Sequence, residues 1–121
     1  MSDPGAASAM DRVRPGVWGG EHVAMTVTDS GAHLEFDCAS GDIAAPLATD
    51  RGGRFVVEGI FVRERAGAIR PGQEPERHRA RYEGLLKDET VTLEVVLIDS
   101  DESIGRFTLA FGATPRVRKC R

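Results

Sequence analysis

Residues 22–38 have the sequence HVAMTVTDSGAHLEFDC, and this stretch decides the fold. Two runs of alternating apolar and polar residues flank residues 29–31, whose Asp, Ser and Gly are typical of a turn. A register that places Val27 opposite Leu34 makes the two apolar faces coincide. The stretch therefore predicts an antiparallel β-hairpin with one buried face.

The same alternation continues along most of the chain, interrupted by glycine-rich and acidic turns, and helical periodicity is absent. Further strands are predicted at residues 43–48, 54–62, 80–86, 90–98 and 103–111, with a short closing strand near 117–120. Pro46 assigns the first of these to a sheet edge or a bulge. The pattern predicts an all-β fold, a single antiparallel meander β-barrel of about eight strands. A β-sandwich is the alternative, because it uses the same alternation.

The composition indicates one domain. A chain of 121 residues fits a single core. Residues 1–15 are small and polar and lack the apolar run of a signal peptide, so we expect a flexible N-terminal segment before a barrel domain at residues 16–121. No apolar run approaches the about 20 residues of a membrane span, and the net charge of −3 gives no general attraction to nucleic acid.

The two cysteines are Cys38, at the end of a predicted strand, and Cys120, in the last residues of the chain. They are either two unrelated thiols or one disulfide, and we favour the disulfide. It would close a loop of about 80 residues, worth on the order of 4 kcal/mol in the chain-entropy model. A disulfide implies a periplasmic or secreted protein, and free thiols imply a cytoplasmic one.

The side chains that could carry chemistry form no recognisable motif. His33, Glu35 and Asp37 alternate on an outward strand face, about 6–7 Å apart, which is too far for all three to bind one metal ion. Residues 99–102 lack the glycine and the distal glutamate of a calcium loop. No histidine or cysteine lies in a nucleophile motif. We therefore predict no enzyme, no metal site and no cofactor.

One long connection, residues 63–79, carries much of the basic charge, and connections of this length often have a function. Nucleic-acid binding would also require exposed aromatic side chains, whereas the phenylalanines fall on predicted inward faces. We expect instead a non-enzymatic binding module for a small apolar or amphipathic ligand at the barrel mouth. Its predicted ligand-binding residues are Tyr82 as a polar contact, Arg77, Arg79 and Arg81 for an anionic group, and Trp18.

The alternative is a structural or interaction protein whose barrel is filled by its own side chains. Several apolar residues fall on predicted outward faces and would form a stripe if their strands are neighbours. Such a stripe predicts homo-oligomerisation. Its residues are Val56, Ile60, Val62, Leu85, Val96 and Ile98.

Two resemblances to known families bear on the fold and the function. Gly16-Val17-Trp18 resembles the Gly-x-Trp motif of lipocalins and other calycin barrels, which implies a lipocalin-like or streptavidin-like barrel, a tryptophan at the closed end, and Arg116 or Arg118 packed on it. A second resemblance covers residues 16–120, on the motifs GVWGGEH, EFDCA, ARYEG and the closing KC. It points to a group of small, uncharacterised bacterial proteins that often carry an export signal. It implies one β-rich domain, a Cys38–Cys120 bridge and a place in the bacterial envelope.

Overall fold

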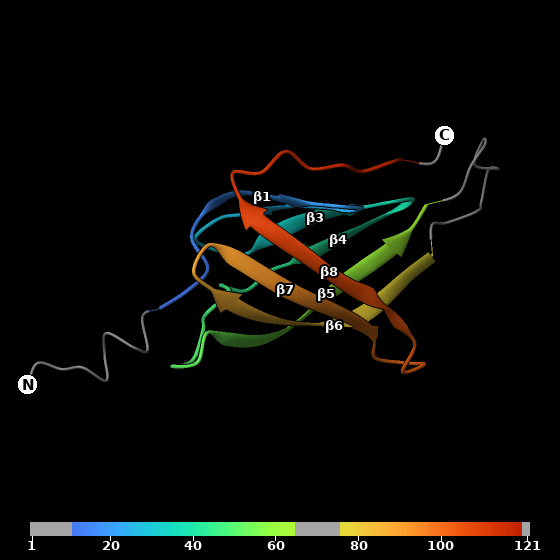
Figure 1. Cartoon of the computed structure of the whole chain (residues 1–121). Coiled ribbons are helices and arrows are strands. Elements are labelled where there is room, and N and C mark those ends of the chain that lie inside the picture. The colour runs from blue at the N-terminus through green and yellow to red at the C-terminus, as the bar shows by residue number, and fades with distance from the viewer. Residues whose placement is uncertain (1–10, 65–75, 120–121) are drawn as a thin grey trace, which may run out of the picture.

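The computed structural model describes residues 11–64 and 76–119, and in them eight antiparallel strands close into one barrel in sequence order (Figure 1). Each strand pairs with the next, and β8 returns to β1. The predicted meander barrel is therefore confirmed. The strands are β1 (Gly16–Gly20), β2 (Val23–Val27), β3 (Ala32–Phe36), β4 (Ala39–Ile43), β5 (Arg54–Arg63), β6 (Glu76–Lys87), β7 (Thr90–Leu97) and β8 (Ser103–Phe111).

The predicted β2–β3 hairpin forms, but the predicted register is wrong by two residues. Val27 lies opposite Ala32, not opposite Leu34. A short turn explains the difference, because the Thr28 N–H donates to the Gly31 carbonyl (2.8 Å) and the Thr28 hydroxyl accepts from the Gly31 N–H (3.2 Å). A shift of two residues keeps every side chain on its predicted face, so the prediction of the buried face is correct.

The prediction of a fourth strand at residues 43–48 is wrong: β4 is Ala39–Ile43. Cys38 adopts a positive φ of 55°, so the chain reverses directly after β3 and pairs with it again. Cys38 thus lies half-buried in a turn, not inward at a strand end as expected. Residues 47–49 pair with the N-terminal segment instead: the Val13 N–H donates to the Leu47 carbonyl (2.9 Å).

Side chains fill the described part of the barrel interior. All eight strands contribute buried apolar residues, the largest of which include Trp18, Tyr82, Met25 and Leu34. The packing is tight at Gly41, where an added Cβ would overlap the Tyr82 hydroxyl. The interior at this level leaves no room for an added methyl group, so the side chains around Tyr82 are closely packed.

One barrel end is closed by Trp18 and the segment that precedes β1. The Trp18 indole N–H donates to the Arg14 carbonyl (2.9 Å), and its ring packs edge-to-face on Phe111 with centroids 5.2 Å apart. Val13, which the sequence assigned to the flexible segment, is buried here. The Arg14 guanidinium lies 4.2 Å from the centre of the Phe111 ring. The arginine of this end therefore comes from before β1.

The chain after β8 runs back along the outside of the barrel toward its other end (Figure 1). In place of the closing strand predicted near 117–120, residues 112–119 form only one bridge, a parallel one between Glu21 and Arg116. This backbone bridge and an ion pair of 3.6 Å between the side chains of the same two residues keep Arg116 away from Trp18. Cys120 lies outside the described residues.

Candidate ligand site at the barrel mouth

The end of the barrel opposite Trp18 is the mouth, where β5 ends and β6 begins (Figure 1). Three phenylalanines from three strands form its floor. Phe36 packs on Phe61 and on Phe107, with ring centroids 5.5 and 5.1 Å apart. Phe36 and Phe61 are buried, and Phe107 is partly buried. Of the three rings, Phe107 is the one that is open enough for an apolar group to contact.

Two basic side chains stand above this floor. Arg63 follows Phe61 by two residues, so both belong to the inward face of β5, and His78 lies directly opposite Phe61 on β6. The Arg63 Nη2 donates to Glu102 Oε2 at 2.8 Å, across the mouth from β5 to the turn before β8. The Arg63 Nε is buried and has no hydrogen-bond partner among the residues that the structure describes. A buried donor without an acceptor is costly, which makes Arg63 the first candidate for holding an anion.

The three predicted arginines do not reach this mouth. Arg77, Arg79 and Arg81 are exposed and alternate along β6 with residues of the inward face, so they lie on the outside of the barrel. Arg79 contacts Glu58 there, at 3.2 Å. The long connection is also shorter than expected, because β6 begins at Glu76 instead of Ala80. Its residues 65–75 lie outside the described residues.

Sequence reasoning misses Arg63 and His78 for the same reason. It treats residues 63–79 as one irregular connection, so it assigns no face to either side chain. The signal that could have found them is the alternation itself: counting back by twos from buried Tyr82 through buried Ala80 places His78 inward.

Tyr82 and Trp18 are both fully buried and belong to the core. The Tyr82 hydroxyl donates to the Ile60 carbonyl at 2.6 Å. Burial raises the pKa of this phenol well above its usual value, with a smaller contribution from the charge of Asp42. Trp18 lies at the closed end, where it was predicted. The structure therefore does not bring the five predicted ligand residues together.

A charged cluster on the outer face near the mouth holds the C-terminal segment. Lys119 Nζ contacts Glu35 (2.6 Å) and Glu64 (2.7 Å) and donates to the Ala39 carbonyl (2.7 Å). His33 joins the cluster with one ring nitrogen on Glu35 and the other on Asp42, the latter at 2.7 Å. Each acidic side chain of the cluster lies beside a basic one, so the cluster is suited to holding the C-terminal segment against the barrel.

The pKa shifts in this cluster follow from the hydrogen bonds between its members. Hydrogen bonds to Asp42 and then Glu35 raise the pKa of His33. Burial alone would raise the pKa of Glu35, but hydrogen bonds from Lys119 and His33 outweigh it and lower that pKa. Burial likewise opposes the charge of Lys119, and the contacts with Glu35 and Glu64 outweigh it and raise its pKa.

Asp37 provides a second attachment for the C-terminal segment. Its carboxylate accepts the Arg118 backbone N–H at 2.7 Å and lies 2.6 Å from His22 Nδ1. These contacts, led by the Arg118 hydrogen bond, lower the pKa of Asp37. The Cys38 N–H in turn donates to the Arg118 carbonyl at 3.1 Å. The structure therefore lays residues 118–119 directly beside Cys38.

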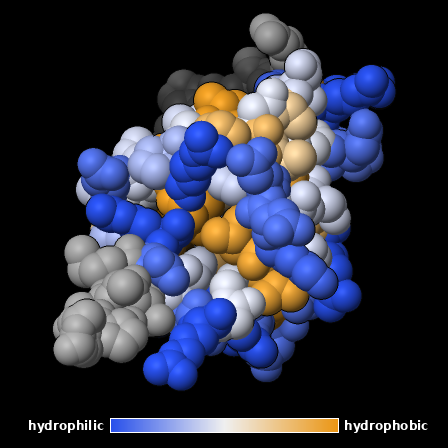
Figure 2. All heavy atoms as spheres, turned by 60° about the vertical axis from the view of Figure 1, so that its left-hand side comes forward, coloured by the Kyte–Doolittle hydropathy of each residue, from blue (hydrophilic) through white to orange (hydrophobic). Residues whose placement is uncertain are grey.

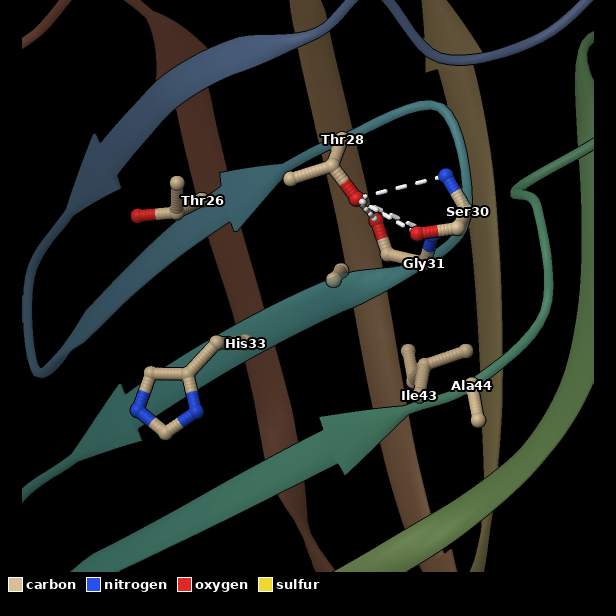
Figure 3. A pocket seen from close by; sticks show the side chains of 8 residues that line it. Thr26, Thr28, Ser30, Gly31, His33, Ile43 and Ala44 are labelled. Carbon is tan, nitrogen blue, oxygen red and sulfur yellow. Dashed lines mark hydrogen bonds between the residues drawn. The ribbon is translucent and has the colours of Figure 1, made fainter.

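A hollow of about 440 Å³ lies beside the β2–β3 turn and the end of β4 (Figure 3). Two of its polar side chains, those of Thr28 and His33, already have partners. The Thr28 hydroxyl lies among the turn atoms, where it accepts from the Ser30 N–H (3.3 Å), and His33 is held by the charged cluster. The hollow is open and its imidazole is held by two carboxylates, so it is a weaker candidate than the mouth.

The predicted outer apolar stripe is interrupted by charge. On neighbouring strands Ile60 lies opposite Arg79, Val62 opposite Arg77 and Val96 opposite Arg81. Ile98, like these three, is only partly exposed. The exposed members are Val56 (52%) and Leu85 (46%). Figure 2 brings the left-hand side of Figure 1 forward. On that face, too, hydrophobic residues lie between hydrophilic ones.

The described residues give little support for a metal site or for a helix that spans a membrane. Among residues 11–64 and 76–119, no three His, Cys, Asp or Glu side chains gather as a metal site. The same part of the chain holds no helix long and apolar enough to cross a membrane. Comparison of the chain with protein-family models, with curated proteins and with solved structures finds no match.

Proposed function

We propose that this protein is a non-enzymatic binding module that holds a small amphipathic anion at the barrel mouth. The observation that carries the proposal is Arg63, a half-exposed guanidinium whose buried Nε finds no acceptor within the described chain, directly above an aromatic floor. The acidic group of a ligand would contact Arg63, and its apolar part would lie on the partly exposed ring of Phe107. A small apolar area with few polar groups is the usual character of such sites.

The filled interior supports a site at the mouth over one deep in the barrel. Met25, Leu34 and Tyr82 are fully buried below the floor. A ligand at that level would have to displace packed side chains, whereas one at the mouth needs only the exposed end of Arg63. His78 adds a second basic group on the same face of β6, opposite Phe61.

Fluorescence titration with anilinonaphthalene sulfonate, an aromatic anion, tests the proposal. We expect one saturable site per chain and a loss of affinity of about tenfold or more in Arg63→Ala, because a charge-assisted hydrogen bond is lost. Arg79→Ala is the matched control, since it removes an equal charge from the outer face. Equal affinity in the wild type and Arg63→Ala would refute the site. Native mass spectrometry of gently purified protein would then identify the natural ligand by its mass.

We further propose that Cys38 and Cys120 form a disulfide and that the protein acts in an oxidising compartment, such as the bacterial envelope. The position of residues 118–119 supports this pairing, because Lys119 and Arg118 are hydrogen-bonded on both sides of Cys38. Cys120 follows directly in the chain, so its reach to Cys38 is short.

A second candidate function is assembly with another copy of the chain. The exposed side chains of Val56 and Leu85 favour it, since two large apolar residues lie diagonally across the β5–β6 pair. In that case the barrel is a filled scaffold and the outer face of β5 and β6 is the functional surface.

A further inference from the structure

We propose that Glu102 is a built-in competitor for the ligand: its carboxylate occupies Arg63, and an incoming anion must displace it. This inference rests on the proposed function. It names Glu102 as a residue that sets the affinity, and it defines the chemical class of the ligand. The ligand must carry an acidic group, such as a carboxylate, sulfonate or phosphate, able to replace a glutamate on a guanidinium.

The geometry supports an exchange of partners. Glu102 Oε2 lies 2.8 Å from Arg63 Nη2, and 52% of its side chain is exposed. Such an ion pair is weak, because solvent screens both charges. Glu102 therefore holds Arg63 with little energy, and a ligand that also contacts the partly exposed ring of Phe107 has an advantage that the carboxylate alone lacks.

Glu102 can leave Arg63 without a change in the backbone of the β7–β8 turn. Its backbone carbonyl accepts the Leu97 N–H at 2.8 Å, which fixes the main chain of the β7–β8 turn independently of the side chain. The preceding residue, Asp101, adopts a positive φ of 58° and gives the turn its shape. Rotation of the glutamate side chain alone is then enough to free the guanidinium.

Removal of the competing charge should tighten binding of an acidic ligand and leave a neutral one unchanged. We expect Glu102→Gln to bind anilinonaphthalene sulfonate about two- to fivefold more tightly than the wild type does, the range set by a weak surface ion pair. Phenylnaphthylamine, the same ring system without the sulfonate, should bind both proteins alike. Asp101→Asn is the matched control, because it removes an equal charge from the same turn but does not contact Arg63.

The outcomes separate this inference from the proposed function. If the wild type does not bind the anion saturably, or binds it as Arg63→Ala does, the proposed function fails and the inference fails with it. If Arg63→Ala loses affinity but Glu102→Gln equals the wild type, the site stands and the competitor role is refuted. Equal tightening in Asp101→Asn would show a general charge effect and would also refute it. Glu102→Ala replaces Glu102→Gln if circular dichroism shows that the glutamine variant is unfolded.

Discussion

Tyr82 shows at the scale of one residue how a polar group becomes part of a core. The sequence predicts it as a ligand contact, because it is the one tyrosine among inward apolar residues. The hydroxyl instead donates to the Ile60 carbonyl on β5, and Gly41 on β4, the strand beyond β5, leaves room for it. Alternation predicts that a side chain faces inward. It does not tell whether a backbone carbonyl will take the hydroxyl, since that depends on how the strands are staggered.

Tyr82→Phe should therefore affect stability and spare binding. The ring volume is kept and one buried hydrogen bond is lost, so we expect the free energy of unfolding to fall by about 1 kcal/mol, measured by urea denaturation. The affinity for anilinonaphthalene sulfonate should equal that of the wild type. A loss of affinity with unchanged stability would contradict this placement and return Tyr82 to the ligand site.

At the scale of the elements, the strands with strong alternation could be predicted from sequence and the others could not. β7 (Thr90–Leu97) alternates almost without exception, and its prediction is correct within one residue. β4 escapes prediction because its sequence ASGDI offers small and polar residues in place of an apolar pattern. The charged start of β6 resembles a connection, which conceals the inward positions of Arg63 and His78. Because the end of β5 and the start of β6 are predicted wrongly, the sequence does not reveal the candidate site.

The disulfide proposed between Cys38 and the C-terminal segment can be tested by counting reactive thiols. In protein prepared from an oxidising compartment, we expect no thiol to react with a maleimide reagent after denaturation, and two to react after reduction. Reduction should lower the free energy of unfolding by several kcal/mol, on the order of 4 for a loop this long. Cys120→Ser, which leaves one thiol, is the reference for labelling. Two reactive thiols before reduction would show that the pairing is wrong.

For the whole molecule, closure of the barrel determines which surfaces remain for partners. The β1–β8 seam is short, with Trp18 opposite Phe111 and Gly19 opposite Ala110, and the C-terminal segment reinforces it through the bridge of Glu21 to Arg116. A closed sheet, as the eight described strands form it, leaves no long free edge for strand addition. A second copy of the chain would therefore have to bind through side chains on an outer face.

The assembly candidate predicts that charge on that face breaks an oligomer without unfolding the barrel. Val56→Glu together with Leu85→Glu should convert the oligomer into a folded monomer, as measured by light scattering during size-exclusion chromatography. The reason is that two carboxylates cannot be buried against a partner without partners of their own. Val17→Glu is the control: Val17 is as exposed as Leu85 (46% each) but lies on β1, away from the β5–β6 face. A wild-type protein that is monomeric, or an oligomer that survives the double change, would exclude this face and leave the mouth as the functional surface of the barrel.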